Sequence, residues 1–164
     1  VQERSGGTTV TQEQATGAAA LAPDTLELIA AGIASATEPW EQRTGTVPAE
    51  RCYERIVLTA AYEVWVICWP PGTGLELHDH GTSAGAFSVV AGTLEETTVE
   101  AGGDDSVRHV GPGEVVHFGA GYVHEVHNRG TDVVTSVHAY SPPLGEMGFY
   151  ERTLTGAVID RLTD

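Results

Sequence analysis

The stretch His78-Asp79-His80-Gly81-Thr82-Ser83-Ala84-Gly85-Ala86-Phe87 decides how the fold of this chain is interpreted. Its two histidines are separated by one residue, and side chains at that spacing point to the same face of a β-strand. On a helix the same spacing would direct the two side chains apart. We therefore expect a β-strand that directs the imidazoles of His78 and His80 to one metal ion.

A third histidine, His124, follows the turn sequence Gly121-Tyr122-Val123. It can reach the first two histidines only if the strands form a closed or nearly closed sheet. Three neutral imidazoles with no carboxylate would leave coordination positions open, as in a catalytic rather than a structural metal site. We predict one metal ion bound by His78, His80 and His124.

The composition indicates one globular domain that binds neither nucleic acid nor membranes. The chain has 164 residues, 41% of them hydrophobic, and a net charge of −15 without a single lysine. Such a surface repels phosphate backbones and anionic lipids. No signal peptide or apolar run of membrane-spanning length is visible, so we expect a cytoplasmic protein. The two cysteines, Cys52 and Cys68, match no zinc motif and are expected to be reduced.

Two parts of the chain are predicted: a flexible tail at residues 1–22, and one domain at residues 23–164. In the domain, a helix is expected to begin at Pro23, with Asp24 as its cap and Glu27 completing a capping box. Its helical spacing of apolar residues predicts a face that packs on the outside of a sheet. The pattern ends at Pro39, and the apolar residues are Leu26, Ile29, Ala30 and Ile33.

The remainder of the chain reads as all-β. Short runs rich in Val, Ile, Tyr and Trp, separated by Gly and Pro turns, indicate a β-sandwich or β-barrel. The final stretch, residues 151–164, has no clear pattern. The predicted strands are 55–59, 62–69, 75–80, 86–91, 93–100, 107–110, 115–118 and 133–140.

Two motifs connect this pattern to a known family. Gly72-x5-His78-x-His80, followed by Gly92, resembles the first cupin motif, and Gly113-x5-Gly119-x-Gly121-x2-His124-x3-Asn128 resembles the second. Gly85 stands where many cupins carry a metal-binding glutamate, and the loss of that glutamate is characteristic of thiol dioxygenases. Over residues 51–143 the chain resembles the cysteine dioxygenase family. This implies a single cupin (jelly-roll) β-barrel with an N-terminal helical segment, and Fe(II) as the metal.

A second group of polar residues, Ser136, His138 and Tyr140, alternates along an apolar strand, so all three face one side. It resembles the Ser-His-Tyr relay of that family. The resemblance implies that Tyr140 lies near the bound thiol and oxygen, that His138 orients Tyr140, and that Ser136 orients His138. Without the cupin motifs the same pattern would be typical of a solvated strand face.

The resemblance also implies three substrate-binding residues. Arg55 would pair with a substrate carboxylate, Tyr53 would add a hydrogen bond, and Trp69 would line the pocket. Arg51 falls outside this match. By itself, an arginine at a strand start is typical of a surface charge.

Gly85 has a further consequence under the resemblance. Animal members of the family carry a cysteine at this position, linked to a tyrosine that matches Tyr140. Glycine cannot form that link, so Tyr140 is expected to be an unmodified phenol, as in bacterial members.

The activity that the resemblance implies is an iron-dependent oxidation of L-cysteine by O2 to cysteine sulfinate. Alternatives are another small thiol such as 3-mercaptopropionate, a non-catalytic metal-binding cupin that acts as a sensor, and a hydrolytic or isomerase cupin. The spacing alone also leaves zinc, nickel and manganese open. No organic cofactor is expected, and the protein is expected to be a monomer or weak homo-oligomer. We assign no metal role to the remaining histidines, His109, His117 and His127.

Overall fold

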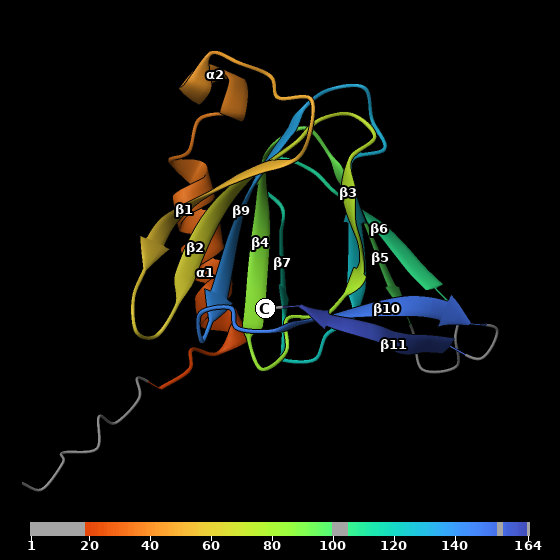
Figure 1. Ribbon diagram of the computed structural model, residues 1–164. Coiled ribbons are helices and arrows are strands. Elements are labelled where there is room, and N and C mark those ends of the chain that lie inside the picture. The colour runs from red at the N-terminus through yellow and green to blue at the C-terminus, as the bar shows by residue number, and fades with distance from the viewer. Residues whose placement is uncertain (1–18, 100–104, 154–155, 164) are drawn as a thin grey trace, which may run out of the picture.

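The computed structural model describes residues 19–99, 105–153 and 156–163. Two helices precede a series of β-strands (Figure 1). The elements are α1 (Pro23–Ser35), α2 (Trp40–Thr44), β1 (Cys52–Leu58), β2 (Glu63–Trp69), β3 (Gly74–His78), β4 (Ala84–Ala91), β5 (Leu94–Val99), β6 (Asp105–Val110), β7 (Val115–Phe118), β8 (His124–His127), β9 (Val134–Ser141), β10 (Met147–Thr153) and β11 (Gly156–Thr163).

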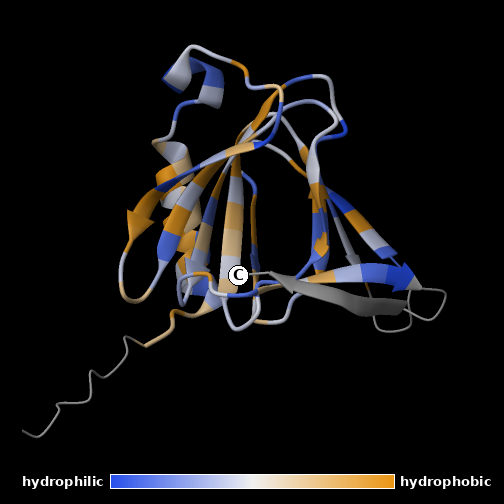
Figure 2. Cartoon of the chain, in the orientation of Figure 1, coloured by the Kyte–Doolittle hydropathy of each residue, from blue (hydrophilic) through white to orange (hydrophobic). Residues whose placement is uncertain are grey.

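The strands form two antiparallel sheets. The five-stranded sheet has the order β1-β2-β9-β4-β7, and the six-stranded sheet has the order β11-β10-β3-β8-β5-β6. The main core contains side chains from both sheets, among them Trp69, Phe87, Leu94 and Val126. Figure 2 shows hydrophobic positions concentrated on the strands and α1. The all-β architecture with an N-terminal helix agrees with the prediction.

Helix α1 covers the outer face of the five-stranded sheet, where it contacts β4, β7 and β9. Leu26 and Ala30 are fully buried there, and Ile29 and Ile33 pack at the edge of the same cluster. The predicted cap is wrong, because the helix begins at Pro23 and its N-cap, Ala22, makes no side-chain hydrogen bond.

The predicted strands are present with shifts of a few residues, and one shift concerns the metal motif. Strand β3 ends at His78, so His80 lies in the following loop and not on the strand. The pairing of β3 with β8 ends at His78. The next residue, Asp79, still donates its amide to Gly148 O of β10 at 2.9 Å. The Asp79 carboxylate also accepts hydrogen bonds from Gly81 N, Gly148 N and the Tyr150 hydroxyl. These contacts with β10 hold the loop that carries His80.

The hairpin of β10 and β11 was not predicted from the sequence. It extends the six-stranded sheet through β10, which pairs with β3 at Phe149 and His78. Most of the predicted flexible tail, residues 1–18, lies outside the described residues. In the part of the chain that the structure describes, no helix has the length and apolar character needed to span a membrane.

Candidate metal centre and substrate pocket

Three buried histidines meet between the two sheets. His78 ends β3, His124 begins β8, and the antiparallel register pairs these two residues. His80 joins them from the β3–β4 loop, and the three rings lie 4.7–5.3 Å apart between centroids. One ligand nitrogen from each histidine lies within 4.8 Å of the others, and each residue is at most 3% exposed.

The nitrogen atoms of this cluster fit a metal ion. His124 Nδ1 donates to Glu96 Oε1 at 2.7 Å, which leaves His124 Nε2 buried with no hydrogen-bond partner among the described residues. His78 Nδ1 contacts Glu76 O at 2.7 Å, so its Nε2 is the nitrogen left for a ligand role. Burial lowers the pKa of His78 to about 3 and that of His80 well below its usual value. The imidazoles of these two residues are therefore neutral at ordinary pH, which is the metal-binding form.

A buried carboxylate holds His124 in place. Glu96 is 0% exposed and lies on β5, which pairs with β8. Its second oxygen accepts from Arg108 Nε, and Tyr122 donates to Oε1 at 3.3 Å. Burial tends to raise the pKa of Glu96, but hydrogen bonds to His124 and Arg108 bring the pKa below its usual value. A charged carboxylate behind a histidine ligand fixes its tautomer and orientation.

Sequence reasoning missed this group of Glu96, Arg108 and Tyr122. The available signal was an acidic residue two positions after an apolar residue of a predicted strand, which places both on one face. Glu96 follows Leu94 in this way, and Leu94 is fully buried. A buried charge needs partners, so it points to a functional or structural cluster.

Gly85 lacks room for a fourth protein ligand. A Cβ atom there would lie 2.5 Å from the Phe118 ring and 3.0 Å from Tyr140 Cδ1. Phe118 in turn stacks on His80, with ring centroids 5.3 Å apart. The aromatic ring thus occupies the space that a glutamate or cysteine side chain at position 85 would need.

The three polar residues of β9 form a continuous hydrogen-bonded relay. Ser136 Oγ lies 2.8 Å from His138 Nε2, and His138 Nδ1 lies 3.1 Å from the Tyr140 oxygen. Trp69 Nε1 contacts Ser136 Oγ at 2.8 Å and can only donate. Ser136 therefore accepts from Trp69, which leaves the Ser136 proton free to be donated to His138 Nε2.

The protonation of His138 determines the direction of the relay. Burial lowers the pKa of His138 to about 3, so the ring is neutral and carries one proton. When Nε2 accepts from Ser136, the proton lies on Nδ1, which then donates to the Tyr140 oxygen. Burial raises the pKa of Tyr140, so the phenol keeps its own proton. In this tautomer the Tyr140 proton is available to a group outside the relay.

A pocket of about 330 Å³ is lined by residues of both sheets and includes His80 and Tyr140 in its wall. Its polar lining includes Arg51, Tyr53, Arg55 and Glu63. Its apolar lining is Trp65, Ile67, Leu75, Leu144 and Met147.

The three residues assigned to substrate binding differ in position. Tyr53 and Arg55 line the pocket, and Tyr53 is 60% exposed with its ring 5.7 Å from that of Trp65. Trp69 is 1% exposed and lies at the Ser136 end of the relay, where its indole N–H donates a hydrogen bond to Ser136 Oγ. Arg55 contacts the Glu63 carboxylate at 3.2 Å.

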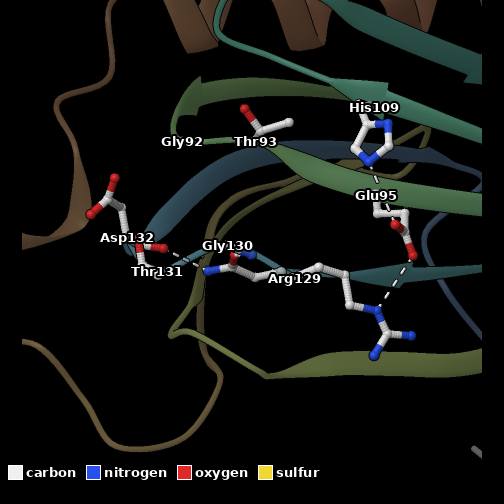
Figure 3. Close-up of a pocket in the computed structure, with 9 residues that line it drawn as sticks. Gly92, Thr93, Glu95, His109, Arg129, Gly130, Thr131 and Asp132 are labelled. Carbon is white, nitrogen blue, oxygen red and sulfur yellow. Dashed lines mark hydrogen bonds and ion pairs between the residues drawn. The ribbon is translucent and has the colours of Figure 1, made fainter.

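Two other polar clusters lie away from this pocket. A surface hollow holds Glu95 between His109 and Arg129, which contact its oxygens at 3.5 and 3.4 Å (Figure 3). On the outer face, His117 Nδ1 lies 2.6 Å from Glu27 and fastens α1 to β7. Neither cluster includes a residue of the histidine triad.

Comparison with known proteins agrees with these features. Residues 10–153 match the family described as Cysteine dioxygenase type I. A conserved protein with a double-stranded β-helix domain from Klebsiella pneumoniae is similar, with a TM-score of 0.53 and 17% identity over 76% of this chain and 96% of that one. The cupin domain of Cnp3 from Schizosaccharomyces pombe gives a TM-score of 0.51 and 13% identity over 59% of this chain and 65% of that domain. An oxalate oxidase gives 0.54 and 19% over 63% of this chain and 57% of its own. These structures confirm the predicted cupin fold.

Proposed function

Because the chain belongs to the cysteine dioxygenase type I family, we propose that it is an Fe(II)-dependent thiol dioxygenase that converts L-cysteine and O2 to cysteine sulfinate. The observation that carries this proposal is the buried triad of His78, His80 and His124 without a carboxylate ligand, next to a pocket that Tyr140 lines. A small thiol with a carboxylate suits the dimensions and charge of that pocket.

Iron held by the three histidines would supply a centre at which a thiolate and dioxygen come together. Because neutral imidazoles do not reduce the charge of the ion, they favour an anionic sulfur ligand. The reaction adds both atoms of O2 to the sulfur, converting a thiol to a sulfinic acid. The thiol supplies all the electrons, so no further reductant is required.

The residues of the five-stranded sheet would position the substrate and hold a proton. The relay from Trp69 through Ser136 and His138 leaves the Tyr140 proton free to be donated to a reactant at the metal. The pocket wall carries two arginines, Arg51 and Arg55, as possible partners for the substrate carboxylate. Tyr53 lies between them in the sequence and adds a hydroxyl to the same wall.

One experiment distinguishes cysteine oxidation from two alternatives, which are oxidation of another small thiol and metal binding without catalysis. The iron-loaded protein is supplied with L-cysteine, 3-mercaptopropionate or cysteamine, and O2 uptake and sulfinate formation are measured. We expect one O2 consumed for each cysteine sulfinate formed. Faster turnover of 3-mercaptopropionate would change the substrate but keep the reaction. Full iron binding without O2 uptake on any thiol would favour a non-catalytic metal-binding sensor.

A further inference from the structure

The arginines of this protein differ in whether an acidic side chain neutralises them. The structure describes six arginine side chains, since only the backbone is described at Arg161, and five of the six form ion pairs with Asp or Glu. The sixth is Arg51, which has no carboxylate partner among the described residues. Its contacts are with the rings of Trp69 and Tyr53, at 5.2 and 5.9 Å.

Arg55, by contrast, already has a buried partner in the pocket wall. Glu63 is 1% exposed, and one of its oxygens lies 3.2 Å from Arg55 Nη1. The other oxygen accepts from Leu144 N at 2.9 Å, which fixes the carboxylate in place. A substrate carboxylate that approached Arg55 would meet this fixed negative charge. Like charges in such proximity oppose binding.

Arg51 also lies close to the centre of the site. It lines the same pocket as His80 and Tyr140, so a ligand in that pocket meets its charge. Arg51 is partly buried and directly precedes β1, at the end where Cys52 pairs with Cys68. It is thus an unneutralised cation close to both the metal triad and the relay.

We propose that Arg51, and not Arg55, receives the carboxylate of the thiol substrate. The inference rests on the proposed thiol dioxygenase function and adds its specificity-determining residue. A charge-assisted bond to a planar guanidinium is strong where water is partly excluded, and Arg51 meets that condition better than the exposed Arg55. The Arg55–Glu63 pair would then form a neutral wall that shapes the pocket.

The test measures binding separately from turnover. Cobalt(II) is loaded in place of iron, and thiols are titrated without oxygen while the thiolate-to-cobalt absorption is followed. The matched probes are 3-mercaptopropionate and 1-propanethiol, which differ in the carboxylate. Arg51→Gln should weaken 3-mercaptopropionate by roughly tenfold or more and leave 1-propanethiol within about twofold. The double variant Arg55→Gln with Glu63→Gln is the control, because it keeps the pocket wall neutral, and it should weaken 3-mercaptopropionate by less than about threefold. Arg51→Lys should recover part of the loss, because a cation is restored without the planar fork.

The outcomes separate this inference from the proposed function. A larger carboxylate-specific loss in the double variant than in Arg51→Gln would overturn the assignment while the thiol site stands. An equal loss for both thiols in Arg51→Gln would also overturn it, since the arginine would then be acting on the metal site as a whole. If no thiol produces the absorption in the cobalt-loaded parent protein, the proposed function fails and the inference fails with it.

Discussion

The two sheets of this barrel contribute different residues to the site. The six-stranded sheet carries His78 and His124, and behind them buried Glu96 with its exposed partner Arg108. The five-stranded sheet carries the relay on β9 and a second such pair, buried Glu63 with exposed Arg55. Each sheet therefore buries one glutamate beside an arginine, but only Glu96 contacts a metal-binding histidine.

This difference shows that a buried carboxylate can act at a metal site without being a ligand. Glu96 orients His124 from behind, whereas Glu63 neutralises an arginine in the substrate pocket. Both are satisfied by hydrogen bonds, as buried charges must be. Substitutions on one sheet should therefore change metal binding, and those on the other should change substrate handling.

The largest effect is expected on the metal sheet. His124→Ala removes a ligand and should abolish most iron binding, because two histidines alone hold the ion weakly. His127→Ala is the matched control, since His127 ends the same strand and is not part of the triad. Iron per chain is measured by metal analysis after purification. Full iron content in His124→Ala would place the metal elsewhere.

On the relay sheet, Tyr140→Phe should leave the iron content unchanged and lower turnover. The substitution removes only the hydroxyl at the end of the relay, and a positioned proton donor is typically worth about 10²–10⁴-fold in rate. Steady-state kcat and iron content are measured on the same preparation. Unchanged kcat would show that Tyr140 only fills the core.

A smaller effect is expected from the same substitution at the two buried glutamates. Glu96→Gln weakens the hold on His124 and should lower metal affinity by about 10–100-fold. Glu63→Gln should leave metal affinity within about twofold, because its partners are Arg55 and Leu144 N. Competition with a chelator gives both affinities. Equal losses would remove the distinction between the sheets.

The smallest expected effect is on the free energy of unfolding, which should depend on pH through one histidine of each sheet. Burial lowers the pKa of His78 on one sheet and of His138 on the other from 6.5 to about 3. Below pH 6.5 the unfolded chain takes up protons that the folded chain refuses, so the free energy of unfolding of the metal-free protein should fall as the pH decreases toward 3. Urea unfolding at several pH values measures this slope. His138→Asn should reduce the slope, and an unchanged slope would show that His138 does not contribute to it.

Much of this site could be predicted from the sequence because its signals are local. Strand periodicity and turn residues indicated the all-β fold, and alternation along residues 136–140 placed three polar side chains on one face. The spacing of His78 and His80 led to the correct pair of residues by a partly wrong route. His80 lies beyond the strand, and the contacts of Asp79 with β10 position its loop.

The sequence by itself therefore determined which elements and residues are present: antiparallel strands, three candidate metal ligands and a row of polar residues on an apolar strand. Those properties depend on residues a few positions apart. Tertiary structure decided the pairing of charges, since Glu96 meets His124 across 28 residues of chain and Glu63 lies on the neighbouring strand from Arg55. It also decided that Arg51 has no such partner among the described residues. Strand register alone determines which charges face one another across a sheet, and no local pattern specifies it.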